Sequence, residues 1–433
     1  MPNIGIIGAG VGGTHLGLFL RQRGVSATIY SEKTPAQHLG ARITNVVCRS
    51  GTTRARERAL GVDFWDADAP DLERFVVVIN GSRPIALSGA LNPPAHVVDM
   101  RLYWPRLLEE FAGRGGSVVY RTVNVDDVEA LSARHDLLVV ASGRGALSNL
   151  FPRLPEHSPF PTPQRLVIAG LFRGIAYPQP LAFEAIVNPG HGEILQFPLF
   201  SFEPDLTALG IEAVRGRGFS VLSAFHPSRF DEQRREFETT VLGLLREYAP
   251  SIYARVDHKR FAAARPLDVG HVAITPTVRR GYVRLSNGRT VLALGDAHIT
   301  MDPITGQGAN KASHAAFVAG AAICETASFD EEFCARAAQQ MCDYALPVSD
   351  ACNARLLPAP PHVVTLLAAA AQHQAVADFY AGSFNDPDRF WDIVSRQDRT
   401  DAITKLLLEG AVSANPLAWD TISALAGARA AVQ

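Results

Sequence analysis

The 433-residue sequence predicts an α/β protein with a mostly parallel sheet, a second and mostly antiparallel sheet, and a helical C-terminal region. Three observations predict this class. The chain opens with a short apolar run, a glycine-rich turn and a helix-like segment, and a second apolar run follows. Strand-like runs broken by proline and glycine occupy residues 151–265. An alanine-rich, helix-like sequence follows Gly306.

The first elements form a strand, a turn, a helix and a second strand. Residues 3–8 are predicted to be a strand, 14–23 a helix and 26–30 the next strand, which is roughly the 30-residue length of a βαβ unit. Extended and helical runs continue after this unit. Strands are predicted at 75–79, 95–100, 116–121 and 136–141, and a helix at 102–111.

The middle of the chain is predicted to form the second sheet and one amphipathic helix at 231–248. The strands of this sheet are expected at 165–172, 181–187, 193–197, 208–214 and 220–225. Asn287-Gly288 then separates two strand-like runs, which is the sequence signature of a hairpin. Helices are predicted at 309–326, 331–346, 361–374 and 401–408.

Composition excludes several classes of protein. The chain has 41 basic and 43 acidic side chains, so it offers no basic field for a nucleic acid. No stretch approaches the roughly 20 apolar residues of a membrane span, and the N-terminal apolar run is too short for a secretory signal. The five cysteines lack C-x-x-C spacing, which predicts neither a disulfide framework nor a metal site. We expect a cytoplasmic protein without membrane or nucleic-acid partners.

The first chemical motif is Gly8-x-Gly10-x-x-Gly13. Gly8 permits the tight turn, Gly10 lets the backbone approach a pyrophosphate, and Gly13 lets the helix pack closely on the strand. The backbone amides of Val11 and Gly12, at the start of the helix, would then face the negative charge of the pyrophosphate. The motif lies between a predicted strand and a predicted helix, which indicates a Rossmann-like dinucleotide site.

The ribose of such a nucleotide is usually held by an acidic residue at the end of the second strand. Here Ser31 occupies that position and Glu32 follows it. We predict that one of these two residues contacts the ribose. A solvated surface role for Glu32 remains the alternative.

A second motif begins at Gly295-Asp296 and continues through Asp302-Pro303 to Gly306-x-Gly308-Ala309-Asn310. A strand ends at the Gly-Asp pair, and two glycines open a long helix whose free N–H groups can face an anion. A second helix start of this kind suits the far end of flavin adenine dinucleotide (FAD). Asp296 would bind the ribitol hydroxyls, and the start of the helix would face the pyrimidine edge of the flavin.

These motifs divide the chain into an FAD-binding domain interrupted by a substrate domain. The predicted boundaries are 1–150 for the first part of the FAD-binding domain, 151–280 for the substrate-binding β-sheet domain, 281–325 for the second part of the FAD-binding domain and 326–433 for the C-terminal helical region.

Together the two motifs resemble the flavoprotein monooxygenases of the para-hydroxybenzoate hydroxylase fold. Within that class, residues 42–45, 98–103, 294–310 and 383–391 resemble the oxygenase component of styrene and indole monooxygenases. The similarity runs from the first strand to about Trp391, and the segment from Asp302-Pro303 to Asn310 is its most specific part. The resemblance also implies cofactor contacts at Arg42, Arg101, Val123 and Gly143.

The resemblance implies a two-component oxidoreductase. A separate NADH:flavin reductase would supply reduced FAD, which reacts with O2 to a C4a-hydroperoxyflavin and epoxidises an aryl alkene or indole. The substrate would be a small apolar aromatic or alkene, the reductase contact would be transient, and a homodimer is left open. The cofactor carries the chemistry, so the protein must keep its pocket dry.

Asn45 and Arg42 are the predicted catalytic residues. Asn45 matches the asparagine that the family places beside the flavin, and it would orient the flavin or the substrate. Arg42 would contact the polar edge of the cofactor, with a surface ion pair as its alternative.

The predicted substrate pocket combines positions implied by the resemblance with apolar strand residues. Where styrene-epoxidising members carry histidines, a tyrosine and a serine, this chain has different residues. The predicted pocket residues are Val47, Arg49, Leu72, Phe75, Ala95, Phe197 and Leu199.

Two other functions compete with this assignment. A single-component aromatic hydroxylase reduced directly by NAD(P)H would share the single dinucleotide motif. A non-catalytic flavin-binding redox sensor would share both glycine motifs but would need no dry pocket.

Overall fold

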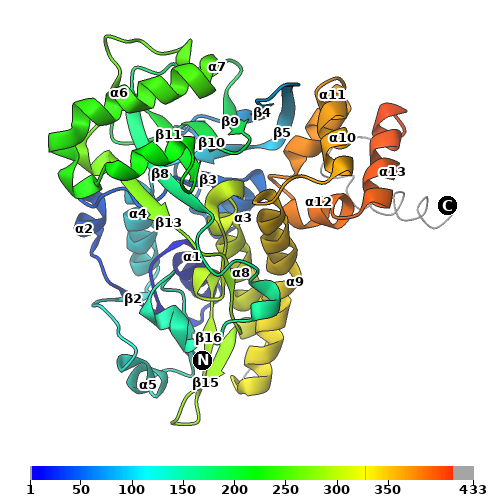
Figure 1. Cartoon of the computed structure of the whole chain (residues 1–433). Helices are drawn as coiled ribbons and strands as arrows, with labels where there is room; N and C mark the ends of the chain where they lie inside the picture. Colours follow the sequence, from blue (N-terminus) through cyan, green and yellow to red (C-terminus); the bar gives the residue numbers. More distant parts are fainter. Residues whose placement is uncertain (1, 327, 413–433) are drawn as a thin grey trace.

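The computed structural model describes residues 2–326 and 328–412. Figure 1 shows one lobe around the N-terminal sheet, a second lobe built on another sheet beneath α6 (Phe230–Tyr248), and a group of C-terminal helices that projects to one side. The predicted residues 413–433 of the C-terminal region lie outside the described part.

The first lobe is built on a six-stranded sheet in the order β15-β16-β7-β1-β2-β6. All neighbouring strands are parallel except the hairpin pair β15 and β16, which flanks Asn287-Gly288. The strands are β1 (Asn3–Ile7), β2 (Ser26–Ser31), β6 (Ser117–Tyr120), β7 (Leu137–Val140), β15 (Tyr282–Arg284) and β16 (Thr290–Ala293). β1 and β7 lie in the centre and are almost wholly buried because the sheet is covered on both faces.

Helices cover this sheet. α1 (Val11–Gln22) and α8 (Gly308–Cys324) pack against each other, so the two glycine motifs, about 290 residues apart in sequence, become neighbours. The other helices of this lobe are α2 (Pro35–Leu39), α3 (Gly51–Leu60), α4 (Met100–Gly113), α5 (Asp127–Ser132) and α9 (Glu331–Arg355).

The second lobe is built on a nine-stranded sheet in the order β12-β8-β11-β10-β9-β4-β5-β3, and β13 also pairs with β8. All pairs are antiparallel except β4 with β9. The strands are β3 (Cys48–Arg49), β4 (Leu72–Ile79), β5 (Ile85–Val97), β8 (Arg165–Arg173), β9 (Ala182–Asn188), β10 (Gly192–Pro198), β11 (Thr207–Val214), β12 (Ala262–Ala263) and β13 (Val269–Ala273).

β4 and β5 come from the part of the chain predicted to belong to the first FAD-binding segment, 1–150. In the structure they extend the second sheet, because β4 pairs with β9 more than 100 residues away. A strand's sequence pattern shows that one of its faces is buried but not which sheet it joins. The chain therefore crosses between the lobes more often than the predicted boundaries allow.

Four local predictions differ from the structure. The predicted strand 220–225 is a 3₁₀ segment, η3 (Gly218–Ala224), which buries Phe219 and Leu222 three residues apart against α6. α9 continues through Pro347 because the residues beyond it are buried. The predicted helix 361–374 is two helices, and α3 and α12 were not predicted. The C-terminal helices are α10 (Pro361–Ala370), α11 (Gln374–Gly382), α12 (Pro387–Val394) and α13 (Gln397–Leu408).

Short elements complete the described chain. They are α7 (Pro250–Tyr253), the two-strand ladder β14 (Thr277–Val278) with β17 (Ile299–Thr300), and the 3₁₀ segments η1 (Ala146–Leu150), η2 (Pro155–His157), η4 (Pro227–Arg229), η5 (Pro266–Asp268), η6 (Gly295–Ala297) and η7 (Pro303–Thr305). Across the described ranges, no helix has the length and apolar character needed to cross a bilayer.

Candidate active site

The N-terminal glycine motif forms the turn between β1 and α1. Gly8 has φ +115°, and a Cβ there would lie 2.4 Å from the Ala141 carbonyl oxygen. A Cβ on Gly13 would lie 2.0 Å from the Gly8 carbonyl oxygen. A Cβ on Gly10 would meet nothing within 4 Å. Gly8 and Gly13 are therefore required by packing, whereas Gly10 leaves open space in front of the helix.

That space lies where α1 can bind an anion. Gly10 is the N-cap, no side chain caps the helix, and its first turn carries no acidic residue. Free backbone N–H groups and the positive end of the helix dipole both favour a phosphate group at such a position. The turn fits the pyrophosphate of a dinucleotide.

The second motif forms the passage from β16 to α8. Gly295 and Gly306 have φ near +65°, a conformation that favours glycine, and Gly308 begins α8. No side chain caps α8, and its first turn carries no acidic residue. Two uncapped helix N-termini therefore face the same region of the molecule.

A cavity of about 270 Å³ lies against both helix starts. Its walls include Val11 and Gly12 of α1, and Gly306, Gly308 and Ala309 at the start of α8. The rest of the wall comes from the segment 43–48 and from one face of the second sheet. The cavity thus joins the predicted cofactor site to the predicted substrate domain.

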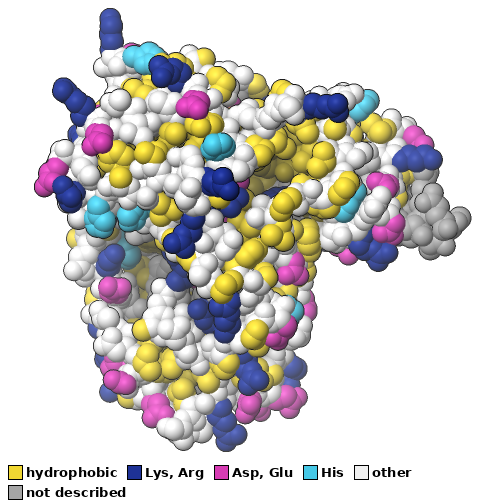
Figure 2. Space-filling view, viewed as in Figure 1, with side chains coloured by type: hydrophobic (Ala, Val, Ile, Leu, Met, Phe, Trp, Pro, Cys, Tyr) yellow, Lys and Arg dark blue, Asp and Glu magenta, His cyan; other side chains and the backbone are white. Residues whose placement is uncertain are grey.

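The sheet presents an apolar wall to this cavity. Phe183, Leu195 and Phe197 line it from β9 and β10, and Gly210 lines it from β11. The rings of Phe183 and Phe197 stack with centroids 4.5 Å apart. Strand side chains alternate between the two faces of a sheet. Ile194 and Ile211, the sequence neighbours of Leu195 and Gly210, therefore pack on the other face, toward α6. Figure 2 shows apolar side chains in the hollow between this sheet and the C-terminal helices.

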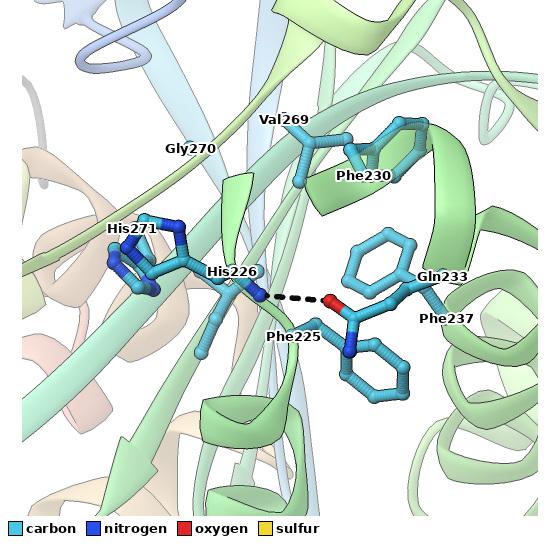
Figure 3. A pocket seen from close by; sticks show the side chains of 9 residues that line it. Phe225, His226, Phe230, Gln233, Phe237, Val269, Gly270 and His271 are labelled. Carbon is cyan, nitrogen blue, oxygen red and sulfur yellow. Dashed lines mark hydrogen bonds between the residues drawn. The ribbon is translucent and has the colours of Figure 1, made fainter. Parts of the chain in front are cut away.

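A second and much smaller hollow lies between α6 and β13 (Figure 3). Phe230 and Phe237 form one side of it, and His226 and His271 lie together on the other. Its volume is about 10 Å³, which has room for no more than one water molecule. It is a packing gap and not a substrate site.

Eleven of the predicted site residues line the large cavity. They are Val11, Gly12, Asn45, Val47, Gly143, Phe197, Asp296, Pro303, Gly306, Gly308 and Ala309. The remaining predicted residues lie outside its wall, and their surroundings explain why.

The residues predicted for the adenosine end lie along and beyond the first sheet. Ser31 ends β2, and its hydroxyl donates to the Lys33 carbonyl oxygen at 2.7 Å. Glu32 is exposed, and Val123 is buried in the core beneath β7. Only Glu32 therefore has a carboxylate free to reach a ribose at this end.

Arg42 and Arg101 are held by other groups of the protein. Arg42 Nη1 donates to the carbonyl oxygens of Pro266 and Val269, which ties the cavity segment 43–48 to the second lobe. Arg101 forms ion pairs with Asp99 at 2.5 Å and with Asp268 at 2.6 Å. Both guanidinium groups position protein segments around the cavity and do not line it.

Asn310 has a similar positioning role. Its amide oxygen accepts from Ser50 N and Thr53 Oγ1, and its amide nitrogen donates to the carbonyl oxygens of Cys48 and Gly306. Three of these bonds join the start of α8 to the segment on the opposite side of the cavity, and the fourth, to Gly306, is local. Gly306 is therefore anchored from within the protein.

Arg49 is not a pocket residue. Its side chain is completely buried, and Nε lies 2.9 Å from Glu57 Oε1. Nη2 lies 2.7 Å from His96 Nε2, and the Tyr103 hydroxyl donates to the same Glu57 oxygen at 2.7 Å. Burial by itself would raise the pKa of Glu57, but Arg49 and the neighbouring histidines lower it to about 2. Arg49 belongs to a polar network beneath the cavity.

Leu72, Phe75, Ala95 and Leu199 belong to the apolar core behind the wall. Phe75 is the register partner of Phe183 on the neighbouring strand, and their rings stack with centroids 4.7 Å apart, so Phe75 supports a wall residue from the side. The resemblance implied pocket positions for Leu72, Phe75 and Ala95, and Leu199 was predicted as an apolar strand residue. None of the four lines the cavity.

Several wall residues were not predicted. They include Trp104, Phe183, Leu195, Glu212, Met301, Asp302 and Phe384. The alternation of β9 to β11 indicates which residues share a face, but only the tertiary structure shows that this face covers the cavity. Cys48 also lines it, and burial raises the pKa of its thiol to about 12, so the thiol stays protonated.

The buried histidines make stability sensitive to acid. Burial lowers the pKa of His15 and of His96 to about 4, and that of His298 to about 3. Between the unfolded value of 6.5 and these values, the unfolded state binds more protons than the folded state. We expect the free energy of unfolding to fall by about 1 kcal/mol per histidine for each pH unit below 6.5. Urea denaturation at pH 7 and pH 5 tests this, and equal values would contradict it.

Residues 143–255 match a family model described as "Styrene monooxygenase A putative substrate binding domain". Styrene monooxygenase StyA of Pseudomonas fluorescens is 37% identical over 400 residues, covering 92% of this chain and 96% of that protein. A styrene monooxygenase StyA of another Pseudomonas is 36% identical with the same coverage.

A solved structure shares the architecture. The flavoprotein/dehydrogenase from Cytophaga hutchinsonii superposes with a TM-score of 0.66, covering 95% of this chain and all of that one, at 15% identity. At this identity the likeness concerns the fold alone. It confirms the predicted flavoprotein fold class.

Proposed function

Because this chain belongs to the styrene monooxygenase family, we propose that it is the oxygenase component of a two-component system that epoxidises an aryl alkene. The observation that carries the proposal is the identity of 37% over nearly the whole chain. It is a flavin-dependent monooxygenase, and its cofactor is FAD. The apolar cavity beside the two helix starts supports the same function.

The residues around the cavity fit FAD. The turn at Gly10 would hold the pyrophosphate on the amides of Val11 and Gly12. Asp296 would bind the ribitol hydroxyls, and the start of α8 at Gly306 would face the pyrimidine edge of the flavin. When reduced, FAD supplies the electrons that activate O2.

The protein's own task is to position the substrate and exclude water. Val47, Phe183, Leu195 and Phe197 give the cavity an apolar wall that suits a small aromatic alkene. An apolar wall offers water no hydrogen bonds, so a bound alkene displaces it readily. We propose that reduced FAD arrives from a separate reductase.

The test supplies reduced FAD without any reductase. Purified protein is mixed anaerobically with reduced FAD and then with O2 and styrene, indole or a bulkier alkene, and we expect an epoxide product. Fast NAD(P)H oxidation by the protein alone would instead establish a single-component hydroxylase. Oxidation of the flavin to yield only hydrogen peroxide, with every alkene tested, would favour a redox sensor.

Asn45 is our candidate for orienting the substrate or the flavin. It lines the cavity, and within the described part of the chain its side chain accepts one hydrogen bond, from the hydroxyl of the adjacent Thr44 at 3.3 Å. We expect Asn45→Ala to lower the epoxide yield per reduced FAD about 10-fold, because a misplaced alkene leaves more oxygen to be released as peroxide. FAD affinity should stay within 2-fold of the wild type. An unchanged epoxide yield would show that Asn45 orients neither the substrate nor the flavin.

A further inference from the structure

Two buried carboxyl groups line the cavity, in addition to Asp296, which is partly exposed and lies 3.3 Å from Lys311 Nζ. Glu212 projects from β11 and is 2% exposed, and Asp302, which precedes η7, is 1% exposed. Glu212 Oε2 and Asp302 Oδ2 are both buried without a hydrogen-bond partner. Unpaired polar atoms in such a place are costly, so their presence requires a reason.

The nearby guanidinium group of Arg165 is already paired with another carboxylate. Arg165 on β8 binds both carboxylate oxygens of Glu193, at 3.0 and 3.2 Å. Glu193 on β10 is directly opposite Glu212 in the sheet. Three carboxyl groups therefore share one guanidinium, and Glu193 makes the two hydrogen bonds to it. Glu212 and Asp302 are left without an ion pair of their own.

This arrangement keeps a proton in the cavity wall. Burial raises the pKa of Glu212 well above its usual range, and the negative charges of Asp302 and Glu193 raise it further. Burial also raises the pKa of Asp302, although the Ile304 amide, donating to Oδ1 at 3.1 Å, opposes this. Cys352 faces the pair through its thiol, which donates to the Asp302 carbonyl oxygen. Burial and neighbouring negative charge both disfavour ionisation, so one carboxyl group of such a pair keeps its proton.

The proposed reaction needs one proton. Epoxidation puts one atom of O2 into the alkene and the other into water. Reduced flavin anion brings two electrons and one hydrogen, so the water requires one additional proton. The alkene has none to give. Of the other acidic groups that line the cavity, the Cys48 thiol is kept protonated by burial, and Asp296 forms an ion pair with Lys311 at 3.3 Å.

We propose that Glu212, paired with Asp302, holds this proton at Oε2 and delivers it to the oxygen atom that leaves as water. The O–H bond of the Glu212 carboxyl breaks, an O–H bond of water forms, and the carboxylate is reprotonated from bulk solvent before the next turnover. The proposal rests on the proposed epoxidase function.

The first test uses the protein without FAD. Infrared difference spectra recorded during a pH titration should show a protonated carboxyl band that persists above pH 5 in the wild type. Glu212→Gln should lose this band. Glu184→Gln is the matched control, because burial also raises the pKa of Glu184, which pairs with Arg255 in the same sheet but does not line the cavity. It should keep the Glu212 band. An unchanged band in Glu212→Gln would refute the proposal.

Thermal unfolding of the same proteins checks that the fold is intact. A carboxyl group whose pKa is higher in the folded than in the unfolded state stabilises the fold while it is protonated. This contribution is complete below the unfolded-state pKa of about 4.5 and is lost as pH rises through the folded-state pKa. The buried histidines raise the stability of both proteins as pH increases from 5 to 7, so the Glu212 contribution is the difference between them. Relative to Glu212→Gln, the wild type should lose stability as pH increases above 5. Equal pH dependence of the two proteins would count against a retained proton on Glu212.

The second test measures turnover with reduced FAD, O2 and styrene. Glu212→Gln should lower the rate of epoxide formation about 100-fold, as expected for loss of a general acid, and remove the decline at high pH. Glu193→Gln should free Arg165 to pair with Glu212 and move this decline to lower pH. Wild-type pH profiles in both variants would refute proton delivery. Absence of epoxide from the wild type would instead refute the proposed function.

Discussion

Gly10→Val is expected to abolish FAD binding while the protein remains folded. A Cβ on Gly10 meets no protein atom within 4 Å, so the larger side chain causes no internal clash. It fills the space in front of the uncapped amides of α1, where the pyrophosphate would lie. We expect the FAD dissociation constant to rise at least 100-fold, which corresponds to about 2.7 kcal/mol.

Fluorescence titration with FAD and thermal unfolding together measure this effect. Gly113→Val is the matched control, because a Cβ there also meets nothing within 4 Å but lies at the far end of α4. It should bind FAD normally. Gly13→Val should instead destabilise the fold, because its Cβ would lie 2.0 Å from the Gly8 carbonyl oxygen. Normal FAD affinity in Gly10→Val would refute the pyrophosphate position.

Glu57→Gln is expected to destabilise the protein by about 3–5 kcal/mol. The substitution keeps the shape of the side chain but leaves the completely buried Arg49 without a counter-charge. Burial of a single unpaired charge is among the most costly changes that a core can undergo. The loss also weakens the base of the cavity, since α3 carries Glu57 and its first residues are bound to Asn310.

Urea denaturation at pH 7 measures the free energy of unfolding of this variant. Glu109→Gln makes the same substitution on an exposed face of α4 and should change stability by less than about 0.5 kcal/mol. The effect of Glu57→Gln should shrink as pH falls from the unfolded pKa of 4.5 toward 2, because the wild-type carboxylate is then protonated as well. A loss below 1 kcal/mol at pH 7 would contradict the proposed network.

The cofactor half of the site was predictable because its signals are local. Gly8, Gly10 and Gly13 act within one turn between a strand and a helix, and Gly306 and Gly308 act at the start of another helix. Each of these conformations depends on residues a few positions away. Spacing within the sequence is therefore enough to predict the geometry.

The substrate half was predictable only in its chemical character. The apolar strands were expected, and Val47 and Phe197 do line the cavity. Arg49 does not, because its partners Glu57 and His96 become neighbours only when α3 packs against β5. Phe75 lies beside Phe183 because β4 joins β9 across more than 100 residues.

By itself the sequence determined the fold class, the family and the two anion-facing helix starts, because short motifs and overall similarity carry that information. The tertiary structure decided which side chains meet. It brought Glu212 of a strand and Asp302 of a distant loop to one cavity, and it assigned the nearby Arg165 to Glu193 instead. Such assignments depend on strand pairing and burial between segments far apart in the chain, and residue spacing does not encode them.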